Sequence, residues 1–197
     1  MIELDGNSLT IEKVFRIAAE GEKVTVSQEA MKRVKASRDI VEQIIDENRV
    51  VYGITTGFGH LCNTRIERKD LERLQTNLIR SHATGVGEPY PKDAVRAAIT
   101  VRINSLLHEV SGVRPEMVDA LVALLNSGIT PLVPQQGSVG CSGDLAPLSH
   151  IMLVLMGEGE VLGEELLDIY SNIKTDEWNS YMQEVSDWEI KKYLGKM

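Results

Sequence analysis

The sequence lacks the features that mark secreted, membrane-spanning or metal-dependent proteins. Its two cysteines, Cys62 and Cys141, form no CxxC pair, which is typical of a protein kept in the reducing cytoplasm. The longest apolar run, residues 151–156, is far shorter than the roughly 20 residues that cross a bilayer. The N-terminus has no basic region followed by an apolar core, so no secretory signal is predicted. The histidines show no HExxH or similar spacing, so we expect no metal site.

The net charge and the glycine spacing argue against nucleic acids and nucleotides as ligands. A net charge of −8 argues against a nucleic-acid-binding surface. The glycine-rich segment 53–59 is not followed by Gly-Lys-Ser/Thr, which argues against a nucleotide phosphate loop. We therefore expect a cytoplasmic globular protein that binds neither nucleic acid nor a membrane and uses neither a metal nor a nucleotide.

Apolar periodicity predicts a mainly α-helical chain with a few short strands. Strands are expected at residues 1–4, 23–26 and 50–54. Helices are expected at 11–19, 69–82, 91–110, 115–127 and 145–156, and a further helix is expected to begin after the N-cap residue Ser27. The helix after Ser27 and the 69–82 helix carry apolar faces made of Met31, Val34, Ile40, Val41, Ile44 and Ile45, and of Leu71, Leu74, Leu78 and Ile79, respectively. Segments 55–59, 83–89 and 137–143 are predicted as glycine loops that could converge on one pocket.

The segment 137–143 has a glycine at every third position, where a simple helix connection would need one. If the amide nitrogen of Gly143 reaches the carbonyl carbon of Cys141, a five-membered ring can close. Loss of water from that ring and from the Ser142 side chain leaves an exocyclic methylene, which is an electrophile. Asp144 begins the next helix, where its carboxylate could cap backbone N–H groups and help to hold the bend.

Each of these residues also has a plainer interpretation. Cys-Ser-Gly by itself is typical of a turn before a helix. A serine-hydrolase elbow fits poorly, because it needs glycine two residues after the nucleophile and Asp144 stands there. Position alone favours a packing role for Tyr52 and a helix-dipole role for His82.

Three motifs in order resemble the aromatic amino acid ammonia-lyases over about residues 1–163. Residues 137–148 (GSVGCSGDLAPL) are similar to the segment that forms the cofactor of that family. Residues 52–59 (YGITTGFG) resemble its mobile loop, and residues 77–87 (NLIRSHATGVG) its substrate-selecting segment. The Ser81-His82 pair resembles that of the histidine ammonia-lyases.

The resemblance implies the N-terminal part of a long-helix-bundle lyase fold. It implies a lyase of histidine catabolism that removes ammonia from L-histidine to give urocanate, in a homotetramer whose sites draw on several subunits. The implied cofactor is 4-methylideneimidazole-5-one, formed autocatalytically from Cys141-Ser142-Gly143. The other implied site residues are Tyr52 as catalytic acid/base, Ser81 and His82 as substrate contacts, and Gly140 and Asp144 as supports of the loop.

The sequence departs from the family in two places. Cys141 replaces the usual alanine, but its side chain takes no part in the cyclisation. Family chains are more than twice as long, and the later segments that supply a carboxylate-binding arginine, an asparagine, a second tyrosine and a glutamate have no counterpart. We expect a truncated lyase region, residues 1–163, with exposed apolar surface at 97–107 and 151–156, followed by a helical tail, residues 164–197, that resembles the C-terminal end of glutamine synthetases. The alternative function is a non-catalytic fragment or a helical interaction module of the same lineage.

Overall fold

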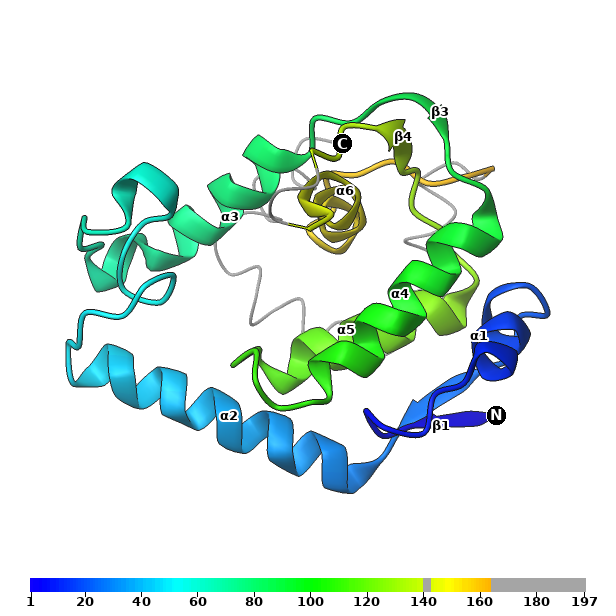
Figure 1. Ribbon diagram of the computed structural model, residues 1–197, viewed down its shortest axis with the longest axis horizontal. Coiled ribbons are helices and arrows are strands. Elements are labelled where there is room, and N and C mark those ends of the chain that lie inside the picture. The colour runs from blue at the N-terminus through cyan, green and yellow to red at the C-terminus, as the bar shows by residue number, and fades with distance from the viewer. Residues whose placement is uncertain (140–142, 164–197) are drawn as a thin grey trace, which may run out of the picture. The chain divides into compact units, whose positions relative to one another are not determined.

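The computed structural model describes residues 1–139 and 143–163, of which residues 1–162 form one compact unit. Over these residues the chain is mainly helical with two small sheets, which confirms the predicted class (Figure 1). Gly140, Cys141, Ser142 and the predicted tail helix lie outside the described residues. The elements are β1 (Ile2–Leu4), α1 (Ile11–Ala18), β2 (Val24–Val26), α2 (Gln28–Asp46), α3 (Leu71–His82), β3 (Val86–Pro89), α4 (Lys92–Leu106), α5 (Pro115–Ser127), β4 (Pro134–Gln136) and α6 (Leu145–Leu155), with short 3-10 turns at Gly59–Leu61 and Arg68–Asp70.

Local signals set several of the boundaries as predicted. Ser27 caps α2 by accepting a hydrogen bond from the N–H of Ala30 at 3.3 Å. Pro115 begins α5, and Gly128 ends it with φ +84° in the left-handed region. β1 and β2 precede and follow α1 in the sequence and pair in parallel with each other, so the predicted N-terminal strands form one small sheet.

The core lies around α4, which packs against both α1 and α5 (Figure 1). Because two of its faces are covered, the prediction of exposed apolar surface at 97–107 is wrong for most of that segment. Val101 is 52% exposed, but the larger apolar side chains of the segment are buried. These buried residues are Ile99, Ile103, Leu106 and Leu107.

Residues 51–55 form a turn, and the predicted strand at 50–54 is wrong. The carbonyl oxygen of Val51 accepts hydrogen bonds from the N–H groups of Ile54 (3.1 Å) and Thr55 (3.0 Å). The Thr55 hydroxyl accepts from the N–H of Val51 at 2.9 Å and donates to the carbonyl of Arg49 at 2.5 Å. A β-branched run extends only where another strand can pair with it, and here the Thr55 side chain takes the place of that partner.

Residues 86–89 form β3, so the predicted loop at 83–89 is wrong over this stretch. β3 pairs antiparallel with β4, and the register places Val86 opposite Gln136 and Pro89 opposite Pro134, with an irregularity between them. Glycine and proline give this segment no local strand signal. The pairing comes from a partner about fifty positions further along the chain.

Helix α3 is less buried than its apolar pattern predicted. None of its residues, all of which are described, is fully buried, because α3 packs mainly against α6. Ile40 on α2 is 59% exposed although it belongs to the predicted apolar face. Residues 152–156 of the α6 segment are partly exposed, as expected, while Ile151 is buried.

Candidate functional site

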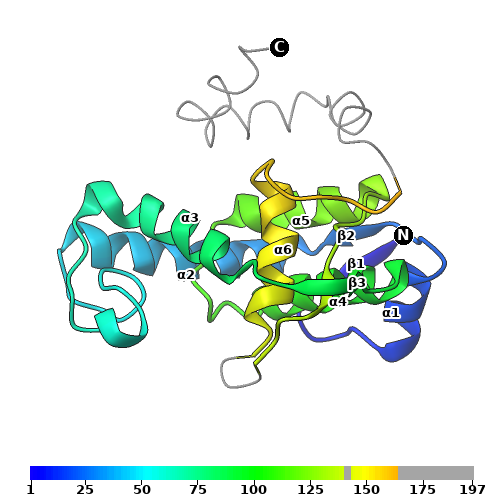
Figure 2. The same cartoon turned by 90° about the horizontal axis from the view of Figure 1, so that it is seen from above.

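A hydrogen bond joins the two residues that flank the segment 139–143. The Ser138 hydroxyl donates to Oδ1 of Asp144 at 2.5 Å. Asp144 is the N-cap residue of α6, the helix that packs against α3 (Figure 2). The predicted helix cap is wrong, because the Asp144 side chain bonds no backbone N–H of the described first turn. Gly143 has φ +76°, and a Cβ built on it would meet no described atom within 4 Å. The chain therefore approaches α6 with Gly143 in the left-handed conformation that favours glycine.

Two glycines bring the end of segment 77–87, predicted to select the substrate, against the base of this loop. A Cβ built on Gly137 would lie 2.9 Å from Cα of Gly85 and 3.4 Å from Cβ of Ala146. A Cβ built on Gly85 would lie 2.9 Å from Nε2 of His150 and 3.1 Å from Cβ of Pro134. A Cβ at Gly137 would overlap backbone, so this position requires glycine, whereas a Cβ at Gly85 would displace the His150 ring and press on Pro134. We call this contact of Gly85 with Gly137 and His150 the glycine junction.

His150 on α6 completes the glycine junction. The N–H of Gly85 donates to Nε2 of His150 at 3.0 Å. Burial lowers the pKa of the His150 imidazole, opposed by the negative charge of Glu160. A neutral ring that accepts at Nε2 carries its proton on Nδ1. We assigned His150 no role from the sequence, although its spacing of four from Ala146 places both on the face of α6 that meets Gly137.

The junction brings the C-terminal end of α3 to the loop. There the Ser81 hydroxyl donates to the carbonyl of Leu78 at 2.9 Å, and Nδ1 of His82 lies 2.8 Å from the same oxygen and 3.1 Å from Oγ of Ser81. If Nδ1 carries the proton and donates to that carbonyl, Nε2 of the neutral ring is an acceptor. The predicted substrate contacts, Ser81 and His82, thus precede Gly85 on the segment that the junction fixes.

An ion pair ties α3 to the end of α6. Nε of Arg80 donates to Oε2 of Glu158 at 2.9 Å, and an Nη2 hydrogen bond to Oε1 measures 2.5 Å. Hydrogen bonding from Arg80 lowers the pKa of the Glu158 carboxyl, against a smaller opposing effect of burial. This two-point contact fixes orientation as well as distance.

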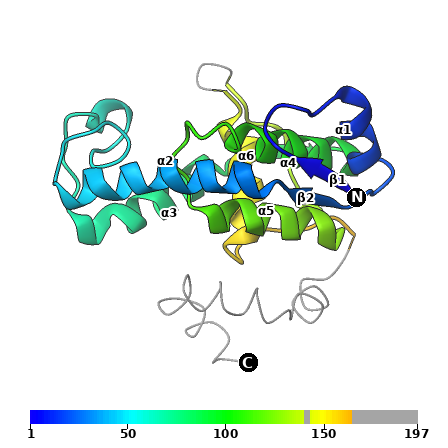
Figure 3. The ribbon, with the colours of Figure 1, turned by 90° about the horizontal axis from the view of Figure 1, so that it is seen from below.

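Tyr52 lies apart from the junction. Its side chain is 61% exposed, its ring packs edge-on against Phe58 at 6.0 Å, and its hydroxyl accepts from the N–H of Gly59 at 3.4 Å. Segment 50–68 lies at the end of α3 opposite α6 in every view (Figures 1 and 3). A twelve-residue helix such as α3 is about 18 Å long. Of the three glycine loops, 83–89 and 137–143 therefore meet within residues 1–162, and 55–59 does not.

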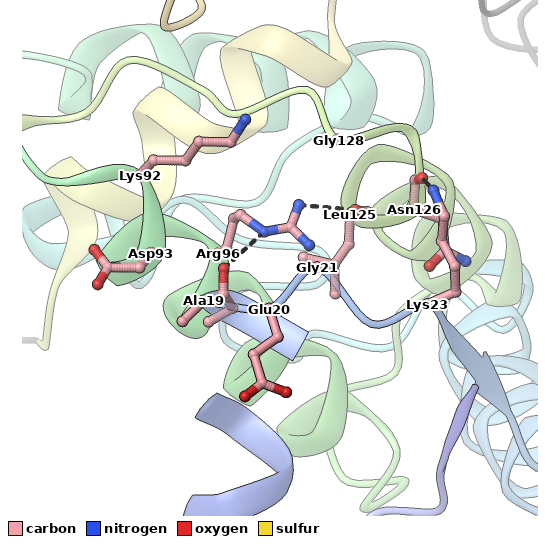
Figure 4. A pocket seen from close by; sticks show the side chains of 11 residues that line it. Ala19, Glu20, Gly21, Lys23, Lys92, Asp93, Arg96, Leu125, Asn126 and Gly128 are labelled. Atoms are coloured by element: carbon pink, nitrogen blue, oxygen red, sulfur yellow. Dashed lines mark hydrogen bonds between the residues drawn. The ribbon is translucent and has the colours of Figure 1, made fainter. Parts of the chain in front are cut away.

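A cavity of about 550 Å³ lies elsewhere, between the ends of α1, α4 and α5 (Figure 4). Its cationic residues are Lys23, Lys92 and Arg96, and no lining residue comes from segments 81–85 or 137–150. Arg96 is buried and donates to the carbonyls of Ile17 (2.9 Å), Ala18 (3.1 Å) and Leu125 (3.0 Å). These carbonyls end α1 and α5 and lack helical partners, so Arg96 has a structural role. Burial lowers the pKa of its guanidinium.

Residues 1–139 and 143–163 contain no cluster of three or more His, Cys, Asp or Glu that could hold a metal ion. Within the same residues, no helix combines the length and apolar character needed to cross a membrane.

Comparison with known proteins identifies the lineage. The aromatic amino acid lyase family matches residues 9–178. A histidine ammonia-lyase of Streptococcus gordonii is 51% identical over 175 residues, which cover 85% of this chain and 34% of the relative. The chain thus spans about a third of the length of the curated relatives it matches. The division into a lyase region, residues 1–163, and a tail, residues 164–197, stays a prediction, as does the resemblance of the tail to glutamine synthetases.

Solved structures agree on the fold. The histidine ammonia-lyase of Trypanosoma cruzi superposes with a TM-score of 0.75 at 38% identity, over 93% of this chain and 34% of that one. An ergothioneine-degrading ergothionase of Treponema denticola gives a TM-score of 0.79 at 33% identity, over 83% of this chain and 33% of that one. The family match, the sequence identity and the shared fold together show that the chain belongs to the aromatic amino acid lyase family.

Proposed function

We propose that the chain carries the ring-forming loop and a substrate-selecting segment of a histidine ammonia-lyase, which eliminates ammonia from L-histidine to give urocanate. The observation that carries the proposal is the glycine junction, which fixes the segment bearing Ser81 and His82 at the base of loop 137–144. The 51% identity to a histidine ammonia-lyase supports this choice of substrate.

The residues around the loop fit the 4-methylideneimidazole-5-one group implied by the family. The Ser138–Asp144 hydrogen bond keeps the two ends of segment 139–143 together, as a ring-forming bend requires. The left-handed Gly143 has no Cβ and no described neighbour in the Cβ direction. In the proposed cyclisation its amide nitrogen bonds to the carbonyl carbon of Cys141, and two waters leave, one of them with the Ser142 hydroxyl. The resulting methylene supplies an electron sink that ordinary side chains lack.

The roles proposed for the other residues follow from their positions. Nε2 of His82, as an acceptor, would orient the N–H of the substrate imidazole. The Tyr52 phenol would take the weakly acidic β-proton. Because Tyr52 lies at the far end of α3, we infer that it serves the loop of another subunit in a homotetramer.

The test is an assay of the purified chain with L-histidine, L-tyrosine and L-phenylalanine. The product is measured by its absorbance, as urocanate from L-histidine or as a cinnamate from the other two amino acids. The same assay is repeated after adding a full-length histidine ammonia-lyase whose own ring-forming serine is replaced by alanine. We expect urocanate from L-histidine in at least one of the two conditions and loss of that activity in Ser142→Ala. Absence of urocanate in both conditions would exclude the proposed function.

A further inference from the structure

The Gly85 amide has a single hydrogen-bond acceptor among the described atoms, the imidazole of His150. Gly85 lies on the segment between α3 and β3, and His150 lies on α6, 65 positions away. An unsatisfied, partly buried N–H is unfavourable, so this contact helps to fix the distance and angle between the two elements, together with the Arg80–Glu158 ion pair. The fit is close, because a Cβ built on Gly85 would lie 2.9 Å from Nε2 of His150 and would force the imidazole to shift.

The contact also sets the base of loop 137–144. Gly85 lies so close to Gly137 that a Cβ built on Gly137 would be 2.9 Å from Cα and 3.4 Å from the nitrogen of Gly85. Gly137 directly precedes Ser138, which hydrogen-bonds Asp144. His150 lies on α6, the helix that follows the loop, six residues after its N-cap Asp144. A shift of Gly85 away from His150 would therefore move the substrate-selecting segment relative to both ends of the loop.

We propose that His150 is a positioning residue, which holds the Gly85 amide and thereby fixes the Ser81-His82 segment on the ring-forming loop. Its function in the reaction rests on the lyase function proposed above. His150 does not touch the reacting atoms in this scheme. It supplies a hydrogen-bond acceptor at Nε2, and that acceptor, rather than the size or charge of the ring, is what the site requires.

The acceptor requirement gives a matched pair of variants. His150→Gln places an amide oxygen near the position of Nε2 and keeps an acceptor, whereas His150→Leu keeps the bulk and removes it. His108→Gln, at an exposed histidine after α4, is the control for the same chemical change outside the junction. Hydrogen exchange of the Gly85 amide in the full chain reads the contact directly and does not depend on activity. We expect exchange about tenfold faster in His150→Leu, the change expected for loss of one hydrogen bond, and near the wild-type rate in both glutamine variants.

A second measurement needs no variant. The ring nitrogen chemical shifts of His150 in the wild-type chain should show the proton on Nδ1 and an unprotonated Nε2 at neutral pH. A proton on Nε2 would overturn the proposal even if His150→Leu fails to fold. So would unchanged Gly85 exchange in a folded His150→Leu chain.

The link to the reaction is read from intact mass. The fraction of chains that have lost two waters should fall in His150→Leu and recover in His150→Gln. Equal fractions in wild type and His150→Leu would contradict a role in ring formation. If the wild-type chain loses no water at all, the proposed ring chemistry fails for this chain, while exchange and chemical shifts still decide the positioning role.

Discussion

Replacement of Gly137 by alanine adds a single methyl group but should strongly destabilise the glycine junction. The new Cβ would lie 2.9 Å from Cα of Gly85, which is backbone and has no side chain to rotate away. Gly137 also has φ +149°, a conformation that residues with a Cβ rarely adopt. The variant therefore combines backbone strain with a steric overlap.

The size of the effect follows from these two terms. An unfavourable φ costs about 1–3 kcal/mol, and forcing an extra carbon into a packed contact costs about another 1–3 kcal/mol. We expect a loss of about 2–6 kcal/mol from the free energy of unfolding, a large share of the 5–15 kcal/mol typical of a domain. Gly128→Ala is the matched control, because Gly128 has φ +84° but open space where its Cβ would stand. Gly128→Ala should therefore show only the cost of the unfavourable φ.

The assay is urea denaturation of both variants, together with the intact mass of the chains that fold. Gly137→Ala should be less stable than Gly128→Ala and should contain a smaller fraction of chains lacking two waters. Equal destabilisation of the two variants would refute the steric argument. A normal extent of water loss in Gly137→Ala would separate the junction from ring formation.

Three further predictions concern other contacts. Arg96→Met removes three hydrogen bonds to helix-terminal carbonyls and should lower the free energy of unfolding by about 3–5 kcal/mol; wild-type stability in urea would contradict this. Because the pKa of His150 is lowered in the folded chain, its contribution to stability is complete above the unfolded-state pKa of about 6.5 and is lost as the pH falls toward the folded-state pKa. His150→Gln should flatten that part of the pH profile of unfolding, and an unchanged slope would argue against a partly buried, neutral imidazole. Ser138→Ala should slow the loss of two waters, with little change in the free energy of unfolding because both partners of its hydrogen bond are exposed. Time-resolved mass spectra of newly expressed chains measure the rate, and an unaffected rate would contradict this prediction.

Features set by neighbouring residues could be predicted from the sequence. The cap at Ser27, the start of α5 at Pro115 and its end at Gly128 each depend on the conformation of a few adjacent residues. The apolar spacing of the helices likewise gave their approximate positions. Its failure at Ile40 reflects tertiary packing, because a periodic face is buried only where another element covers it.

Features that depend on which partner a strand or a side chain finds in the folded chain could not be predicted. β3 forms because β4 pairs with it, and segment 51–55 turns because the Thr55 hydroxyl satisfies the backbone. Asp144 bonds Ser138 instead of the backbone of its own helix. His150 carried no motif of its own, and its role emerges only when Gly85 is brought beside α6.

The central claim is that loop 137–144 forms an electrophilic ring from backbone, and intact mass tests it most directly. We predict that the purified wild-type chain is lighter than its sequence by two waters, and that Ser142→Ala has the full mass expected from its own sequence. A wild-type chain at full mass would contradict the account, as would loss of two waters in Ser142→Ala.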